Sequence, residues 1–229
     1  MRIGIVTFPG TTCERDTYLW CKRTGHNPFF IHHTETSIEQ MDFLILPGGF
    51  AFGDREYSSA TDCYIMNPGG MALETPVMRA IENCVHKIPI LGICNGFQIL
   101  VRAGILQGEL CRNVSDVFFC DHVECYFVNS KTDNNLLLWN HQASVYPSID
   151  IPIAHGYGRY QVTSSEYKEL TKDNQIFLKY TENVNGSSYS VAGVCNRERT
   201  VWGMMPHPER SPHSETFMRA IETYVKNNL

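Results

Sequence analysis

The chain lacks the features of several common protein classes. It has no run of Lys and Arg, and 19 basic against 24 acidic residues leave a net charge of −5. The electrostatic footprint of a nucleic-acid-binding protein is therefore missing. No apolar stretch approaches the roughly 20 residues that span a bilayer, and Pro9-Gly10 interrupts the first apolar run too early for a signal peptide. We expect a cytoplasmic protein that binds neither nucleic acid nor membrane.

Disulfide and zinc patterns are also missing, although cysteine is plentiful. The nine cysteines are odd in number and scattered, which indicates free thiols in a reducing compartment. Cys120 and Cys125 are too far apart for a CxxC pair, and no second pair matches them. There is no GxxxxGK[ST] phosphate loop either. We predict no metal site and no cofactor in this chain.

Apolar runs alternate with helical patterns along the first half of the chain. This alternation predicts a parallel sheet covered by helices on both faces. The expected strands there are 3–7, 29–32, 43–46 and 89–93, with helices over 11–24 and 73–85. Thr11 and Glu14 have the spacing of a capping box for the first helix.

The second half is richer in short strands. They are predicted at 117–128, 144–146, 151–154, 176–180, 190–194 and 201–205, before a last helix over 214–227. No repeat or linker divides the chain. We therefore predict one α/β domain over residues 1–229, with three layers and a mostly parallel, flavodoxin-like central sheet.

One segment has the form of a nucleophile elbow. Gly92-Ile93-Cys94-Asn95-Gly96 joins an apolar strand to a helical pattern, and the pattern G-x-nucleophile-x-G permits the sharp turn between them. Cys94 would project at the amino end of a helix, whose dipole favours a thiolate, and the Asn95 amide would face an oxyanion. A buried structural cysteine is the alternative for any single thiol, and the motif also fits thiol hydrolases of the α/β-hydrolase type.

A base for this thiol is available near the C-terminus. Met205-Pro206-His207-Pro208-Glu209-Arg210 follows an apolar strand. If the two prolines hold this segment extended, Glu209 lies on the same side as His207 and can orient its imidazole. A rigid proline turn with solvated charges is the other interpretation.

A third segment ends at the same sheet edge. Leu46-Pro47-Gly48-Gly49-Phe50 closes a predicted strand, and ligands bind at the carboxyl ends of such strands. The backbone amides of Gly49 and Phe50 could complete an oxyanion hole with that of Asn95. An ordinary loop turn is the alternative interpretation of this segment.

Taken in order, the motifs resemble those of class I (triad-type) glutamine amidotransferases. They are PGGF-x-x-GD, GICNGFQIL, IAHG-x-GRY and MPHPER, with FPGTTCERD, HTET and NGSSYSVAGVCN beside them. The resemblance covers nearly the whole chain and is closest to the glutaminase subunits of phosphoribosylformylglycinamidine synthases.

The resemblance implies a role for each matching residue. Cys94 would be the nucleophile, His207 the general acid and base, and Glu209 its orienting carboxylate. Gln98 would contact glutamine, and the loop His155-Gly156-Tyr157 would hold the amino-acid end of the substrate. The implied partner is an ATP-dependent synthetase subunit, in the family often with a small third subunit, and ATP and Mg²⁺ would bind to that partner.

Several positions depart from the family pattern. Tyr57 replaces an expected arginine, an insertion follows near residues 58–72, Tyr157 occupies a glutamate position, and Asp121 stands where an arginine is usual. These departures concern the ammonia acceptor and the partner more than the glutaminase step. A glutaminase for another acceptor, a stand-alone thiol hydrolase and a non-catalytic regulatory subunit therefore remain alternatives.

Overall fold

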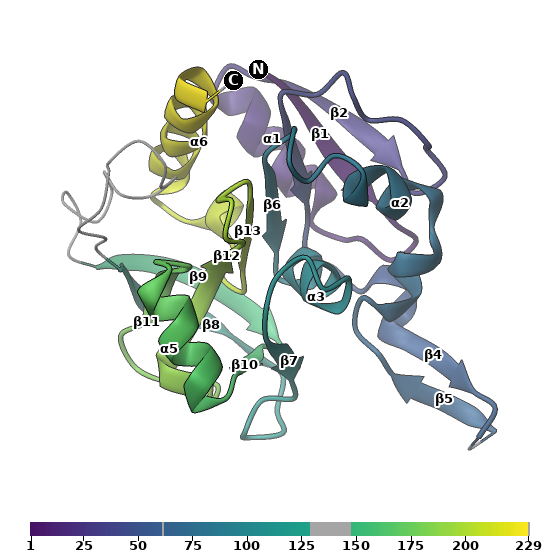
Figure 1. Cartoon of the computed structure of the whole chain (residues 1–229), viewed down its shortest axis with the longest axis vertical. Coiled ribbons are helices and arrows are strands. Elements are labelled where there is room, and N and C mark those ends of the chain that lie inside the picture. The colour runs from purple at the N-terminus through teal and green to yellow at the C-terminus, as the bar shows by residue number, and fades with distance from the viewer. Residues whose placement is uncertain (61, 129–147, 229) are drawn as a thin grey trace.

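The computed structural model describes residues 1–60, 62–128 and 148–228. A nine-stranded sheet runs through the molecule in the order β2-β1-β3-β6-β13-β12-β11-β8-β9 (Figure 1). Its strands are β1 (Arg2–Thr7), β2 (Asn27–His32), β3 (Phe43–Leu46), β6 (Ile90–Ile93), β8 (Phe119–Phe127), β9 (Ile149–His155), β11 (Ile176–Tyr180), β12 (Val191–Cys195) and β13 (Val201–Met204).

The sheet has a parallel and an antiparallel part. The five strands from β2 to β13 pair in parallel, and β12, β11, β8 and β9 extend it with antiparallel pairs. The parallel strands read as continuous apolar runs because they are buried on both faces: all four residues of β3, β6 and β13 are buried. The predicted α/β class with a central sheet is confirmed.

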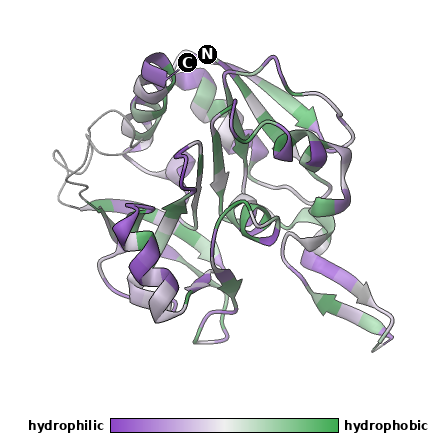
Figure 2. Cartoon of the chain, viewed as in Figure 1, coloured by the Kyte–Doolittle hydropathy of each residue, from purple (hydrophilic) through white to green (hydrophobic). Residues whose placement is uncertain are grey.

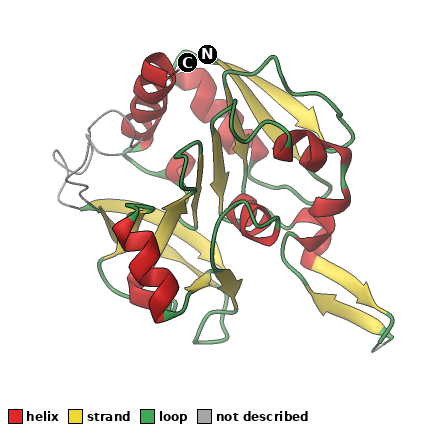
Figure 3. Ribbon diagram, viewed as in Figure 1, coloured by secondary structure: helices red, strands yellow, loops and turns green. Residues whose placement is uncertain are grey.

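Helices cover both faces of the parallel part (Figure 3). Helix α1 (Glu14–Arg23) packs on β1 and β2 and also touches α6 (Ser214–Asn228). On the opposite face, α3 (Asn95–Arg102) packs on β3, β6 and β13, with α2 (Pro76–Glu82) nearby (Figure 1). This arrangement follows from right-handed crossovers between parallel strands, and it gives the predicted three layers.

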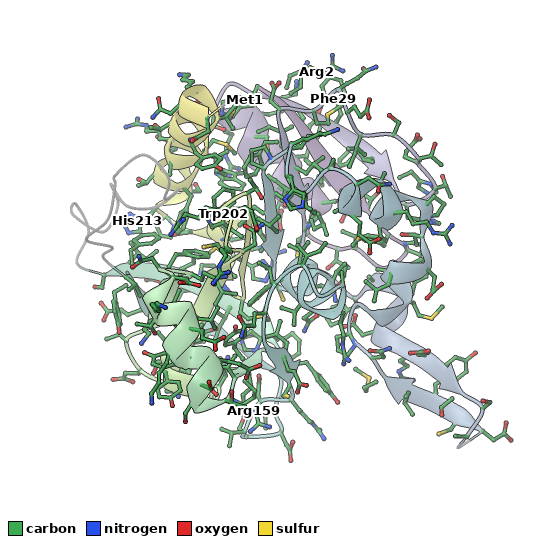
Figure 4. All side chains as sticks on the ribbon, in the orientation of Figure 1. Met1, Arg2, Phe29, Arg159, Trp202 and His213 are labelled. Atoms are coloured by element: carbon green, nitrogen blue, oxygen red, sulfur yellow. The ribbon has the colours of Figure 1, made fainter. Side chains whose placement is uncertain are left out.

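The apolar core follows the central strands, which are the greenest part of Figure 2. Trp20 on α1 and Trp202 on β13 are fully buried. Trp202 lies inside the molecule (Figure 4) and meets the ring of Tyr224 on α6 edge-on, with ring centroids 4.8 Å apart. Burial of such large rings fixes α6 against the sheet. None of the helices among the described residues is long and apolar enough to cross a membrane.

Some elements were absent from the sequence prediction. A hairpin of β4 (Arg55–Ser58) and β5 (Cys63–Met66) projects from the body of the molecule (Figure 1), followed by a 3-10 turn over Gly70–Glu74. The hairpin overlaps the insertion expected near residues 58–72. The others are the pair β7 (Glu109–Cys111) and β10 (Arg159–Gln161), helix α5 (Ser164–Lys172), and 3-10 turns over Ala51–Asp54, Ser188–Ser190 and Pro208–Arg210.

The first helix does not begin as predicted. Its first residue is Glu14, its N-cap is Cys13, and no side chain caps it. The Thr11 hydroxyl instead accepts a hydrogen bond from the Phe8 amide at 2.9 Å, so the predicted capping box is wrong. The helix predicted over 73–85 is shorter, since 70–74 form a 3-10 turn. The strand predicted at 144–146 lies outside the described residues.

Candidate active site

Cys94 lies at the turn between β6 and α3. Its backbone has φ 52° and ψ −104°, a region that costs energy for a residue with a side chain and that is typical of strained functional turns. The Cys94 amide donates to the Met204 carbonyl on β13 at 2.8 Å, which fixes the turn to the sheet. The predicted elbow geometry is present.

The two glycines of the elbow permit close packing. A methyl group on Gly92 would lie 2.7 Å from the Gly96 carbonyl oxygen, and one on Gly96 would overlap the carbonyl oxygen of Leu46 on β3. Any larger residue would push α3 away from the sheet. The spacing G-x-C-x-G therefore sets how near α3 starts to the strand ends, and Cys94 is its N-cap residue.

His207 and Glu209 form a buried pair beside the elbow. The His207 Nδ1 and Glu209 Oε1 atoms are 2.7 Å apart, and both side chains are at most 2 % exposed. The His207 amide donates to the Pro152 carbonyl on β9 at 2.8 Å. The pair sits at a 3-10 turn over Pro208–Arg210 and not on the extended segment we expected, yet the turn still brings the carboxylate to the imidazole.

Charge determines the protonation state of His207. Burial by itself would lower the pKa of the imidazole, but the Glu209 carboxylate and hydrogen bonding to Cys13, Cys94 and Glu209 raise that pKa well above 6.5. His207 therefore carries a proton at neutral pH. Since Nδ1 faces Glu209, its Nε2, which is buried without a well-formed hydrogen bond, is the nitrogen left for chemistry with Cys94.

Two loops meet next to Cys94, at the point where the strand order reverses between β1 and β3. The loop after β1 pairs with the loop after β3 through an isolated bridge between Thr11 and Gly49. The Phe50 amide donates to the Gly10 carbonyl at 2.9 Å. Because this donor is already engaged, Phe50 does not offer its amide to an oxyanion, and the prediction for this residue needs correction.

Gly49 keeps the donor that Phe50 lacks. The Gly48 carbonyl accepts from the amides of Thr12 and Cys13, at 3.3 and 3.1 Å. In a trans peptide the N–H points opposite to the C=O, and the described chain contains no cis peptide. The Gly49 N–H is therefore turned away from α1, on a residue that lines the same cavity as Cys94. The start of α1 thus fixes the orientation of this peptide.

We expect Gly10→Ala to weaken this oxyanion hole. Gly10 has φ 93°, and an added methyl group would overlap the Phe50 carbonyl oxygen. The two loops must then separate, and because a lost oxyanion donor costs about 10²–10³ in kcat, a displaced one should cost about 10- to 100-fold. Steady-state kinetics of the expected glutamine hydrolysis measure this loss. Alkylation of Cys94 by iodoacetamide forms no oxyanion and should stay within about twofold of wild type.

Gly25→Ala is the matched control. Gly25 also has positive φ (82°), but a methyl group there would meet nothing within 4 Å. It carries the same backbone strain without touching the loops. Equal kcat in the Gly10→Ala and Gly25→Ala variants would show that the loop contact does not position the Gly49 amide.

The predicted substrate residues line a cavity of about 370 Å³ together with Cys94. Gln98 donates from Nε2 to the Tyr157 carbonyl at 2.6 Å and accepts from Asn95 Nδ2 at 2.8 Å. It therefore supports the loop that begins at His155, and Gly156 and Tyr157 of that loop face the cavity. All four predicted residues, Gln98, His155, Gly156 and Tyr157, are brought together in one wall.

His155 differs from His207 in charge. Burial, with the positive charge of His207 as a smaller cause, lowers the pKa of His155 to about 4. Its Nδ1 lies 3.1 Å from Asn113 Oδ1, so the neutral ring is fixed in the wall. A neutral His155 next to a protonated His207 leaves one positive imidazole at the site.

The cavity wall carries both signs of charge. Its charged residues are Asp54, Arg55, Arg112 and Asp116. Burial raises the pKa of Asp54 to about 6, against the opposing effect of its hydrogen bonds with Asn95 and Gly69. Arg112 and Asp116 pair across one turn, with Nε and Oδ1 3.1 Å apart. Charges of both signs match an α-amino acid, which carries an ammonium and a carboxylate.

Sequence reasoning missed Cys13, Asp54 and Asn113. Cys13 comes from the far end of the chain, yet its Sγ lies within 4.8 Å of ligand atoms of both His207 and Glu209. In the sequence, Cys13 is one residue of the motif FPGTTCERD and has no assigned role, and no spacing rule connects Cys13 to Cys94. Asp121, a departure from the family pattern, lies on β8 outside the cavity lining.

Comparisons with known proteins agree with this geometry. The model of the CobB/CobQ-like glutamine amidotransferase domain family matches residues 1–224. The chain is 39 % identical over 214 residues, 92 % of this chain and 91 % of that protein, to the phosphoribosylformylglycinamidine synthase subunit PurQ of Prochlorococcus marinus (strain NATL2A).

Solved structures are similar to this chain in fold. The structure of PurLQS from Thermotoga maritima is similar over 98 % of each chain, with TM-score 0.83 and 31 % identity. A glutamine amidotransferase from Thermotoga maritima shares the fold at TM-score 0.55 and 15 % identity, over 99 % of this chain and 81 % of that one.

Proposed function

The chain belongs to the CobB/CobQ-like glutamine amidotransferase domain family, and from this premise we propose that it is the glutaminase subunit of a phosphoribosylformylglycinamidine synthase. It hydrolyses L-glutamine to glutamate and ammonia. The ammonia passes to an ATP-dependent synthetase subunit, which aminates formylglycinamide ribonucleotide in purine biosynthesis. The observation that carries this proposal is the Cys94 elbow next to the buried His207–Glu209 pair, with Cys94 lining a cavity that carries charges of both signs.

The first chemical step is attack by sulfur. The Cys94 thiolate adds to the side-chain amide carbon of glutamine, and the amides of Asn95 and Gly49 stabilise the negative oxygen that results. Asn95 is the first residue of α3, and the first amides of a helix have no acceptor within it. Both donors are fixed before substrate arrives, so they need no reorganisation during the reaction.

His207 then acts as the general acid and afterwards as the general base. Its raised pKa keeps a proton available for the departing ammonia, and the collapse of the intermediate leaves a γ-glutamyl thioester on Cys94. The imidazole, now neutral, accepts a proton from water as water attacks the thioester. Glu209 stabilises the imidazolium in both steps and holds Nε2 toward the sulfur. Glutamate leaves and the thiolate is restored.

The acceptor chemistry belongs to a partner. ATP and Mg²⁺ serve the synthetase subunit, and a small third subunit completes the assembly. Exposed apolar side chains of the cavity lining support a contact with a protein partner: Phe50 and Phe118 are 46 % and 50 % exposed, with ring centroids 6.4 Å apart. The β4–β5 hairpin adds exposed Tyr64, Ile65 and Met66. Exposed apolar groups gathered near a site are typical of interaction surfaces.

The function is tested by reconstitution. The chain is purified with the proteins that bind it, and the complex is assayed for ATP-dependent amination of formylglycinamide ribonucleotide with glutamine or with ammonium chloride. We expect both nitrogen sources to work in the complex. Glutamine hydrolysis without any synthetase would instead favour a stand-alone thiol hydrolase, and a complex that uses only ammonium would favour a non-catalytic subunit.

A further inference from the structure

We propose that the Asp54 carboxylate binds the α-ammonium group of L-glutamine and so makes this group a requirement for tight substrate binding. This role rests on the proposed glutaminase function, and it names the residue that recognises one end of the substrate. Asp54 is the last residue of the motif PGGF-x-x-GD and takes no part in the chemical steps described above.

Asp54 is a buried residue on the wall of the substrate cavity. It is 6 % exposed, and it lines the same cavity as Cys94. The side chain of Asn95 connects the two, because Asn95 follows Cys94 in the chain and donates from Nδ2 to Asp54 Oδ1 at 2.9 Å. A glutamine whose side-chain amide lies at Cys94 therefore shares its cavity with this carboxylate.

Asp54 has no cationic partner among the described residues. It accepts hydrogen bonds from Asn95 and Gly69, but it is a member of none of the ion pairs between described side chains. The other carboxylate of the cavity lining, that of Asp116, pairs with Arg112 at 3.1 Å. Burial of an unpaired carboxylate is costly, and here it raises the pKa of Asp54 to about 6. A cation carried by the substrate offsets this cost.

The backbone at Asp54 adopts an unusual conformation. Phe52, Gly53 and Asp54 all have positive φ, at 54°, 73° and 54°, although two of the three have side chains that make this region costly. The Asn67 amide donates to the Asp54 carbonyl at 2.8 Å, and the Gly53 amide donates to the Phe50 carbonyl at 2.7 Å. Strain of this kind persists where surrounding contacts fix it, and it is concentrated at functional sites. The turn therefore fixes the position of Asp54 before a substrate binds.

The carboxylate has the capacity to bind an ammonium group. An ionised carboxylate accepts about four hydrogen bonds, and Asn95 and Gly69 supply two of them. Hydrogen bonds between an ammonium and a carboxylate are roughly twice as strong as those between neutral groups. The α-ammonium is the only cationic group of glutamine, so it is the group that Asp54 recognises.

Asp54→Asn in the assembled complex tests this recognition. Asparagine has nearly the same size and tolerates positive φ, and its carbonyl oxygen can still accept from Asn95, but it carries no charge. We expect KM for L-glutamine to rise about 30-fold or more, because one partner of a buried charge pair is lost. We expect kcat to change less than KM, because the α-ammonium is remote from the reacting amide. Release of glutamate measures both constants.

An analogue without the ammonium separates recognition from support of the cavity wall. 4-Carbamoylbutanoate is glutamine with hydrogen in place of the α-ammonium, and its inhibition constant is measured in competition with L-glutamine. In wild type we expect this constant to exceed KM for L-glutamine about 30-fold or more. In Asp54→Asn we expect it to rise no more than about twofold, because the lost interaction is absent from this ligand. An unchanged constant also shows that the cavity of the variant is folded.

Asp42→Asn is the matched control. Asp42 also accepts from a backbone amide, that of Arg2 at 2.7 Å, and it lies outside the cavity lining, so both constants should remain as in wild type. An unchanged KM in Asp54→Asn, or an equal rise of both constants, would overturn the role of Asp54 and leave the glutaminase intact. A wild-type complex that hydrolyses no glutamine would overturn the proposed function itself.

Discussion

Cys94→Ala should abolish glutamine-dependent amination and leave ammonium-dependent amination intact. Without the sulfur no thioester can form, and removing the nucleophile of a catalytic triad costs about 10⁴-fold or more in kcat. The synthetase reaction with free ammonia needs only the partner's site. Parallel assays of one purified complex with glutamine and with ammonium chloride measure both rates.

The effect should be specific to this thiol. Cys84→Ala removes another buried cysteine and should leave both activities within about twofold of wild type, as is usual for residues outside the site. Since Cys94 has positive φ, alanine in its place keeps the same backbone strain. Residual glutamine-dependent activity above about 1 % of wild type would contradict the role of Cys94 as nucleophile.

Glu209→Gln should lower kcat about 10²- to 10⁴-fold, as neutralising the orienting carboxylate of a triad does. In wild type burial is the largest single effect on the pKa of His207 and lowers it, but the Glu209 charge together with hydrogen bonding to Cys13, Cys94 and Glu209 raises that pKa above its ordinary value. Without the Glu209 charge, the pKa of His207 should fall. Because the departing ammonia needs the protonated imidazole, the residual activity should fall with rising pH at a lower pH than in wild type.

The same titration affects stability. A raised pKa in the folded state contributes stability that is full below the ordinary value of 6.5 and is lost as pH rises through the raised value. Wild type should therefore be more stable than Glu209→Gln, most clearly below pH 6.5. Melting temperatures of both proteins, recorded at several pH values, measure this difference.

Glu222→Gln is the control for this experiment. It removes the carboxylate of a second histidine–glutamate pair, in which His26 Nε2 and Glu222 Oε1 lie 3.0 Å apart, between the segment that follows α1 and helix α6. This change should leave kcat and its pH profile as in wild type. A Glu209→Gln profile that coincides with wild type would rule out Glu209 as the orienting group.

Most of the fold could be predicted because its strands are buried on both faces. Phe43–Leu46 and Ile176–Tyr180 were placed at their observed bounds, since short continuous apolar runs between turn residues allow few other interpretations. The β4–β5 hairpin could not be predicted. Its strand Cys63–Met66 is exposed at every residue, so it shows no alternation that would mark a buried face.

The site was predictable where its residues are neighbours in sequence. The elbow and the His207–Glu209 pair are local motifs, and their side chains meet as expected, although the pair is held by a 3-10 turn and not by an extended segment. Contacts between loops that are far apart in the sequence could not be predicted. The Phe50 amide donates to the Gly10 carbonyl, and the amides of Thr12 and Cys13 donate to the Gly48 carbonyl. These bonds depend on the approach of the β1 and β3 loops, which no residue pattern encodes.

Trapping of the acyl-enzyme is the sharpest test of Cys94 as the nucleophile. Wild-type complex is mixed with glutamine, quenched in acid within the first turnovers, and digested for peptide mass spectrometry. We expect a γ-glutamyl adduct on the peptide that contains Cys94, cleaved by hydroxylamine as a thioester and absent from Cys94→Ala. Glutamate formed at the full rate with no adduct, or an adduct on Cys13 in place of Cys94, would contradict it.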